Sequence, residues 1–227
     1  MRADEDETRM IELWHCADAR SFRALWTLEE MGLPYRLHLL PFPPRFRQPE
    51  YLERNPLGTI PLLIDGETRM TESAAIIEYL AVRHGPTPLA VTADEADYGA
   101  WLNWLHFGEA TLTFPQTLVL RYRRMEPPER RLPQAADDYA QWYRSRLRAV
   151  DRALGDGREW LAAGRFTGAD ISVGYALLLA RSLGLDVDLP PAIAAYWERL
   201  SARPGYLRAR EAQRAQASVL PEPYTSR

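Results

Sequence analysis

The feature that most constrains the fold is a change of pattern near residue 88. From Met10 to Gly85, short apolar runs typical of strands alternate with helix-like segments, whereas after Pro88 only helical periodicity is found. Gly85, Pro86 and Pro88 cluster at this change, as is common at domain boundaries. The sequence therefore predicts a small α/β domain followed by an all-α domain, and 227 residues suffice for both.

The first part has the predicted order β-α-β-α-β-β-α. We expect strands at 11–14, 35–40, 60–64 and 68–70, and helices at 20–31, 49–54 and 72–84, with Thr71 as the cap of the last. A strand–helix–strand unit followed by a hairpin and a helix implies a small mixed sheet covered by helices. Residues 10–86 would form this domain, after a disordered acidic extension over 1–9.

The second part predicts only helices. They are expected at about 93–120, 134–154, 168–183, 190–203 and 204–214. Pro115 should bend the first of them, because proline lacks the main-chain N–H that a helix needs. Residues 93–215 would form this domain, and 216–227 an irregular tail.

Composition excludes several kinds of site and partner. All 28 basic residues are arginine, so no lysine is present for a Schiff base or a phosphate-binding loop. The single cysteine, Cys16, excludes an intrachain disulfide and a cysteine-based zinc site, and the four histidines lack metal-ligand spacing. We therefore expect no metal and no tightly bound cofactor.

The location and the large partners are constrained in the same way. A net charge of −3 gives no bias toward nucleic acid, and no apolar run approaches the roughly 20 residues that span a membrane. The acidic first residues lack the apolar core of a signal peptide, so a cytoplasmic protein is expected, with neither nucleic acid nor membrane as a partner.

Proline at the start of a buried strand is the first candidate binding feature. Pro61 cannot donate a hydrogen bond to a sheet, and a cis bond after Ile60 would turn the Ile60 main-chain groups toward an extended peptide. An ordinary edge-strand proline explains the sequence as well.

A second candidate lies ten residues further on, across a predicted hairpin. Thr71, Glu72 and Ser73 stand where a helix begins, and free N–H groups at such a start attract an anion. Glu72 could bind an ammonium group and Ser73 a carboxylate, which together suit the head group of an amino acid. Ordinary helix capping also accounts for these residues.

Three segments resemble glutathione S-transferases. These are NPLGTIPLLIDGETRMTESAAIIEYL (55–80), LEEMGLPYRL (28–37) and RFTGADISVGYALL (165–178), and the similarity extends from Met10 to about Ala215. The resemblance implies a thioredoxin-like N-terminal domain, an all-helical bundle as the C-terminal domain, and a homodimer. It also implies glutathione as a co-substrate, bound by Thr59, Ile60, Pro61, Glu72 and Ser73. Thr59 stands where many relatives have a basic residue.

The group that activates the glutathione thiol should lie in HCADARSFR (15–23). The family uses Tyr, Ser or Cys here, and no Tyr is present. The resemblance favours Ser21 as the catalytic residue, with Cys16 and Arg20 as alternatives. Ser21 could instead merely start the helix, and Cys16 could be a small buried residue at the end of a strand.

The resemblance also implies a second-substrate site on the first long helix, with Trp104, Phe107, Glu109 and Phe114 as candidates; an aromatic stripe of this kind also suits a core. Thr167 and Asp170 have the spacing of a capping box, which indicates a structural role worth about 1–2 kcal/mol.

The predicted function is glutathione transfer to a small hydrophobic electrophile, as in detoxification, or reduction of a peroxide. A glutathione-dependent disulfide reductase and a non-catalytic binding or regulatory module are the alternatives.

Overall fold

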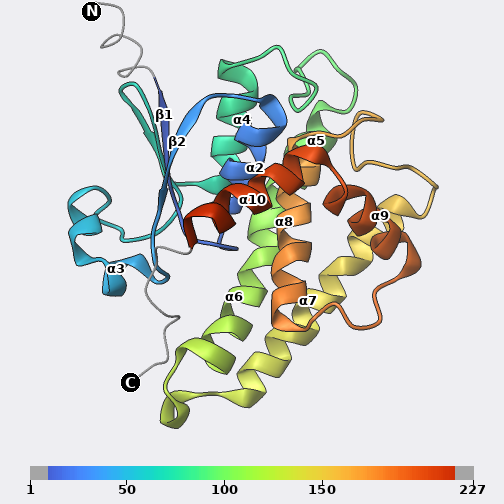
Figure 1. Ribbon diagram of the computed structural model, residues 1–227. Coiled ribbons are helices and arrows are strands. Elements are labelled where there is room, and N and C mark those ends of the chain that lie inside the picture. The colour runs from blue at the N-terminus through green and yellow to red at the C-terminus, as the bar shows by residue number, and fades with distance from the viewer. Residues whose placement is uncertain (1–9, 218–227) are drawn as a thin grey trace, which may run out of the picture. The chain divides into compact units, whose positions relative to one another are not determined.

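The computed structural model describes residues 10–217, which divide into two compact units (Figure 1). The N-terminal unit comprises residues 10–87 together with 203–217, and the helical unit comprises 88–202. The predicted extension at 1–9, and the predicted tail beyond residue 217, lie outside the described residues.

The N-terminal unit is built on a four-stranded mixed sheet. Its strands are β1 (Ile11–His15), β2 (Tyr35–Leu39), β3 (Leu62–Asp65) and β4 (Thr68–Met70), in the order β2-β1-β3-β4. β1 pairs with β2 in parallel, and the β1–β3 and β3–β4 pairs are antiparallel. The predicted sheet class and all four predicted strands are confirmed.

Helices cover both sides of this sheet. They are α2 (Phe22–Met31), α3 (Pro44–Arg47), α4 (Ser73–Arg83) and α10 (Pro204–Ala217), with a short 3-10 helix at Pro49–Glu53. In Figure 1, α2 and α4 lie on one side of the sheet and α3 on the other.

Two local predictions differ from the structure. The stretch 41–49, which its proline content predicts to be a loop, contains α3, because the fixed φ of Pro44 suits the first turn of a helix. Thr71 does not cap α4: the helix begins at Ser73 with Glu72 in the capping position, and no side chain makes a capping hydrogen bond.

The C-terminal helix α10 belongs to the N-terminal unit, in contrast to the predicted helical domain 93–215. The Tyr206 ring packs edge-on against Phe22 and Trp26 of α2, with ring centroids 5.6 and 5.1 Å apart. Arg203 forms an ion pair with Glu30 of α2 at 2.8 Å. Side chains from opposite ends of the sequence therefore build one core.

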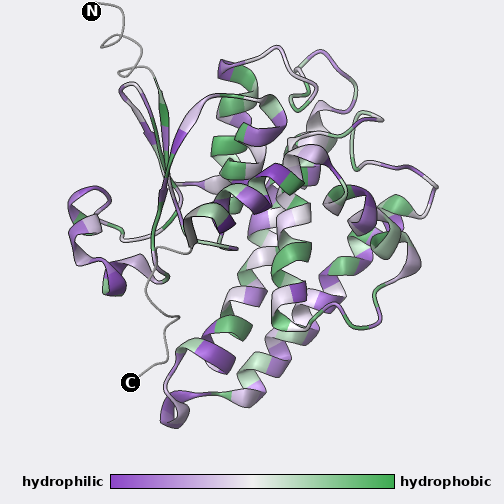
Figure 2. Ribbon diagram, viewed as in Figure 1, coloured by the Kyte–Doolittle hydropathy of each residue, from purple (hydrophilic) through white to green (hydrophobic). Residues whose placement is uncertain are grey.

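The helical unit contains five α-helices among its described residues. These are α5 (Tyr98–His106), α6 (Phe114–Leu120), α7 (Pro133–Leu154), α8 (Gly168–Leu183) and α9 (Pro191–Ser201), with π-helical segments at Phe107–Thr113 and Arg121–Met125 and a 3-10 turn at Pro128–Arg130. α8 is buried along almost its whole length. α7 alternates hydrophilic and hydrophobic residues, as its colours in Figure 2 show, and buries one face only.

The long helix predicted over 93–120 is interrupted where Pro115 was expected to bend it. The turns before Pro115 are π-helical, because proline cannot donate to the carbonyl four residues earlier and its ring crowds that carbonyl. In this widened segment Gly108 packs on α8. A Cβ at Gly108 would lie 2.4 Å from the Ser172 hydroxyl oxygen, so only glycine fits.

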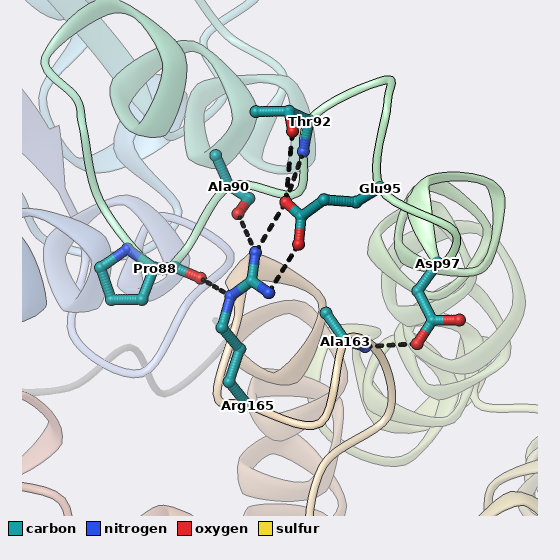
Figure 3. A network of polar contacts seen from close by, with 7 residues as sticks. All are labelled: Pro88, Ala90, Thr92, Glu95, Asp97, Ala163 and Arg165. Carbon is teal, nitrogen blue, oxygen red and sulfur yellow. Dashed lines mark hydrogen bonds and ion pairs between the residues drawn. The ribbon is translucent and has the colours of Figure 1, made fainter.

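The same helix begins five residues later than predicted, at Tyr98. Arg165 holds the preceding stretch in an irregular conformation (Figure 3). Its guanidinium donates to the carbonyls of Pro88 and Ala90 at 3.2 and 2.9 Å, and it pairs with the Glu95 carboxylate at 2.7 Å. These charge-assisted bonds fix the irregular path of the stretch between Pro88 and Glu95.

The predicted capping box at the start of α8 is confirmed. Asp170 is completely buried and accepts hydrogen bonds from the Thr167 N–H and hydroxyl, the Leu161 N–H and the Tyr196 hydroxyl, at 2.7 to 3.1 Å. One carboxylate thus joins the loop before α8 to α9. None of the helices within residues 10–217 combines the length and the apolar character that crossing a membrane requires.

We expect Asp170→Ala to lower the free energy of unfolding by about 1–3 kcal/mol, because its four buried donors would lose their acceptor. Chemical denaturation of the variant and the parent protein measures this difference. A variant that unfolds at the same denaturant concentration would show that the network contributes nothing to stability.

The pH dependence of stability should also carry the signature of Asp170. Burial raises the pKa of Asp170 to about 6, above the value of about 3.9 for an unfolded Asp. Between these two values the folded chain binds the extra proton, so the contribution of Asp170 to stability decreases as the pH rises from about 4 to 6. Denaturation of the parent and Asp170→Asn over this range should show that slope in the parent alone.

Candidate active site

Strand register brings three predicted site segments together in the N-terminal unit. β1 and β3 pair Trp14 with Leu62, and continuing this antiparallel register places Cys16 opposite Ile60. β3 and β4 pair Leu63 with Met70, and the same continuation places Glu72 opposite Pro61. The segment after β1, the turn before β3 and the start of α4 therefore meet at one end of the sheet.

The turn before β3 has the predicted backbone conformation. The bond between Ile60 and Pro61 is cis, and neither the N–H nor the C=O of Ile60 has a hydrogen-bond partner within residues 10–217. The turn is held from behind, where the Thr59 carbonyl accepts from the Tyr51 hydroxyl and the Asn55 amide, both at 2.8 Å. Main-chain groups of Ile60 are thus available to a ligand on a fixed turn.

A cation that the sequence analysis missed lies beside this turn. Gly58 has a positive φ of 59°, and a Cβ there would lie 2.6 Å from the Arg45 Cβ. The Arg45 side chain therefore starts next to the turn. It is exposed, and its guanidinium carbon lies 4.6 Å from the Phe46 ring centroid, with no carboxylate partner among the described residues. One indication of this arrangement is present in the sequence: Arg45 lies in the proline-rich stretch that precedes the NPLG segment.

The start of α4 offers both charges that an amino acid head group needs. Glu72 is exposed, and its carboxylate has no partner among residues 10–217. Ser73 is 3% exposed and its oxygen accepts a bond of 3.2 Å from the buried Arg23 guanidinium of α2, which leaves the Ser73 hydrogen free to donate. The helix N–H groups and Arg23 make this side of the site electropositive.

The thiol candidate Cys16 is a buried core residue. It has no exposed surface and packs in a cluster with Trp14, Tyr51 and Ile60. Burial raises the pKa of the Cys16 thiol to about 12, so the thiol stays protonated near neutral pH. Its sulfur lies 3.8 Å from the Pro41 carbonyl oxygen. The alternative of a small buried residue at the strand end describes Cys16 correctly.

The other two candidates in this segment differ in exposure. Ser21 also has no exposed surface; its hydroxyl oxygen lies 2.7 Å from His15 Nδ1 and accepts the Cys16 N–H at 3.2 Å. In this conformation the Ser21 hydroxyl reaches no ligand without giving up His15. Arg20 is half-buried at the start of α2. His15 and Gln213 of α10, which the sequence analysis did not single out, complete the surroundings of Ser21.

The second-substrate candidates lie on the helical unit, which also has a hollow. This hollow of about 380 Å³ is lined by Leu102, Asn103, His106, Phe107, Ala110 and Thr111. Phe107 is the one candidate on its wall, and Trp104 contacts Phe107 edge-on with centroids 5.1 Å apart. Phe114 packs instead against Tyr139, and Glu109 is half-buried.

Within residues 10–217, no group of three or more His, Cys, Asp or Glu side chains is placed to hold a metal ion.

Comparison with known proteins covers both units. Residues 19–83 match the glutathione S-transferase N-terminal domain, and residues 116–204 match the glutathione S-transferase C-terminal domain. Glutathione S-transferase 3 of Schizosaccharomyces pombe is 36% identical over 45% of this chain and 43% of its own length, so that match spans less than half of the relative. Glutathione S-transferase 3 of Zea mays is 31% identical over 70% of this chain and 74% of its own.

Solved structures share the fold. Ure2p in complex with glutathione has a TM-score of 0.78 and 23% identity over 89% of this chain and 98% of its own, and the nitrogen regulation fragment of yeast Ure2p has 0.79 and 23% over 90% and 97%. The thioredoxin-like sheet, the helical unit and the two family matches agree, and the chain belongs to the glutathione S-transferase family.

Proposed function

We propose that the chain binds glutathione in the N-terminal unit and transfers it, as the thiolate, to a small hydrophobic electrophile. The observation that carries this proposal is the meeting of two groups that have no partner among the described residues, the Ile60 main chain and the Glu72 carboxylate, beside the start of α4. One group suits the middle of an extended peptide and the other suits a free ammonium.

The tripeptide fits these groups in one direction. Its γ-glutamyl ammonium pairs with Glu72, and the neighbouring carboxylate accepts bonds from the Ser73 hydroxyl and the first N–H groups of α4, close to the Arg23 charge. The cysteinyl main chain pairs with Ile60. Cys16 stands opposite Ile60 in the continued register, so the ligand sulfur faces the segment Cys16–Ser21 and the start of α2.

Arg45 completes the proposed site at the glycyl end. Thr59 stands where many relatives have a basic residue, and it contributes its carbonyl to the internal bonds of the turn. The exposed Arg45 side chain starts beside Gly58 and supplies the missing cation for the glycyl carboxylate. Both ends of the ligand then have a partner of opposite charge.

The chemistry requires the thiolate. A free thiol has a pKa of about 8.5, and lowering it by two units takes about 2.7 kcal/mol of selective stabilisation. Hydrogen-bond donors at the start of α2 and the dipole of that helix stabilise a nearby thiolate and so lower the pKa of the glutathione thiol. The sulfur then forms a thioether bond as the electrophile releases its leaving group with the bonding electrons. With a peroxide, two glutathione molecules give the disulfide, an alcohol and water.

The hollow on α5 and the adjoining π-helical segment is proposed as the binding surface for the hydrophobic electrophile. Phe107 with its neighbour Trp104, Leu102 and Ala110 offer apolar contact area, and Asn103 and Thr111 offer hydrogen bonds at its edge. We further propose, from the family resemblance, a cytoplasmic homodimer.

A non-catalytic binding module is the second candidate. The buried Ser21 hydroxyl favours it, because the segment Cys16–Ser21 then presents no side-chain hydroxyl to a thiol. A Ure2p structure described as a nitrogen regulation fragment has the same fold. A disulfide reductase that works through Cys16 is disfavoured by the raised pKa of that thiol, which leaves only a route through glutathione itself.

The proposed activity is tested with the purified protein. We expect retention on immobilised glutathione and turnover of a broad aromatic electrophile, which follows from a bound thiolate. Binding without turnover would favour the non-catalytic module, and absence of binding would remove the proposal. Separate assays with an organic hydroperoxide and a mixed disulfide identify the reaction type.

We expect Glu72→Gln and Arg45→Ala each to weaken glutathione binding by about tenfold, because each removes one charged partner of the ligand. Calorimetric titration measures the dissociation constants. Glutathione amide, which lacks the glycyl charge, should bind the Arg45→Ala variant and the parent equally. Equal loss for both ligands would contradict the role of Arg45.

We expect Phe107→Ala to raise the KM for a hydrophobic electrophile several-fold while the KM for glutathione stays the same, because about 1–2 kcal/mol of apolar contact is lost at the hollow. Phe114→Ala, at an aromatic residue outside the hollow, is the matched control. Steady-state kinetics with both substrates varied provides the measurement. A Phe114→Ala effect equal to that of Phe107→Ala would place the electrophile elsewhere.

A further inference from the structure

A chain of buried hydrogen bonds joins the segment after β1 to the C-terminal helix α10. His15 and Ser21 have no exposed surface, and Gln213 is 3% exposed. His15 Nδ1 lies 2.7 Å from the Ser21 oxygen, and His15 Nε2 lies 3.0 Å from Gln213 Oε1. Residues 198 positions apart in the sequence thus share one polar network beside the proposed thiol position.

The direction of each hydrogen bond in this network follows from the Gln213 amide. Its nitrogen donates to Asp18 Oδ1 at 2.7 Å, and its oxygen accepts from the Asp18 N–H at 3.2 Å. The oxygen therefore faces His15, and since an amide oxygen only accepts, His15 Nε2 carries a hydrogen. Burial lowers the pKa of His15 to about 4, so the ring is neutral near neutral pH and Nδ1 accepts the Ser21 hydrogen.

This direction matters for Ser21. A serine hydroxyl has one hydrogen, and here it points to His15 Nδ1 at 2.7 Å, in preference to the Cys16 carbonyl oxygen at 3.5 Å, while the Ser21 oxygen accepts the Cys16 N–H at 3.2 Å. A thiolate needs a donor, and Ser21 has no second hydrogen to offer. Its hydroxyl therefore holds the main chain of its own segment from the inside.

Asp18 is the residue through which α10 contacts this segment. Its φ is 54°, in the left-handed region that Asp tolerates better than most residues. Its carboxylate pairs with Arg210 of α10 and accepts from Gln213. The neighbouring Ala17 is exposed. A strained loop residue with two partners on one helix indicates that α10 sets the conformation of the loop.

We propose that α10 is part of the glutathione site: Gln213 is a positioning residue that fixes the segment Cys16–Ser21 through Asp18 and His15, and Ser21 supports this segment instead of donating to the thiol. The inference rests on the proposed function, which places the ligand sulfur at this segment. If the segment loosens, glutathione binds more weakly and its thiolate loses stabilisation.

The test variant is Gln213→Met, which keeps the length of the side chain and removes its hydrogen bonds. We expect about tenfold weaker glutathione binding and a higher pKa of the bound thiol, read from thiolate absorbance against pH. Hydrogen exchange of the Cys16 amide should accelerate, although Gln213 does not touch that amide. An unchanged thiol pKa and unchanged exchange would overturn the proposal.

Arg203→Ala is the matched control, because it breaks the ion pair of α10 with Glu30 and lies outside the network. It should lower the melting temperature without changing the thiol pKa or the exchange of the Cys16 amide. If it reproduces the Gln213→Met effects, α10 contributes only general stability and the proposal fails.

A double-mutant cycle with Ser21→Ala separates the two roles of Ser21. If Gln213 and Ser21 act through one network, the double variant binds glutathione no more weakly than the weaker-binding of the two single variants. Ser21 would be the direct donor to the thiolate if the losses of glutathione affinity are additive and the thiol pKa rises in Ser21→Ala but not in Gln213→Met. If the parent protein binds no glutathione, the proposed function fails, and the Cys16 exchange data still decide whether Gln213 positions the segment.

Discussion

The proposed site depends on two hydrogen bonds, which the Asn55 side chain and the Tyr51 hydroxyl donate to the Thr59 carbonyl. Both groups are buried or nearly so, and both donate at 2.8 Å to an oxygen just ahead of Ile60. The carbonyl before the turn thus has its partners inside the unit, whereas the Ile60 main-chain groups have none within residues 10–217. Gly58 allows this approach, since any side chain there would collide with Arg45 and Leu52. The rest of the proposed site is arranged around that turn by strand register.

The sequence predicted what local patterns determine. Strands and helices with clear periodicity were placed within a few residues, and the capping box followed from Thr167 and Asp170 at a fixed spacing. The cis bond before Pro61 was one of two interpretations of that proline, and the cis bonds before Pro43 and Pro86 were not predicted. The capping box and the cis bond before Pro61 both depend on near neighbours in the chain. Proline also misled the prediction at 41–49, where it starts a short helix instead of forming a loop.

What the sequence did not predict depends on long-range contacts. α10 joins the N-terminal unit because Tyr206 and Arg203 find partners on α2, and no periodicity reveals which surface an amphipathic helix covers. The same contacts determine the environment of Ser21. A serine at a helix start commonly caps the helix, but here its hydroxyl is taken by His15, whose other nitrogen is held by Gln213. The position of Arg45 beside Gly58 was hidden for the same reason.

Each unit pairs its buried polar side chains in a network of hydrogen bonds, but the two networks hold different parts of the molecule. In the helical unit Asp170 collects four donors, and the network joins elements of one domain as a structural support. In the N-terminal unit the network runs from α10 to the loop that faces the proposed ligand. Partly satisfied buried networks are costly, so each must form completely or not at all. The conformation of the segment after β1 therefore depends on contacts with the last helix, and the geometry of the proposed thiol site is a property of the whole folded unit.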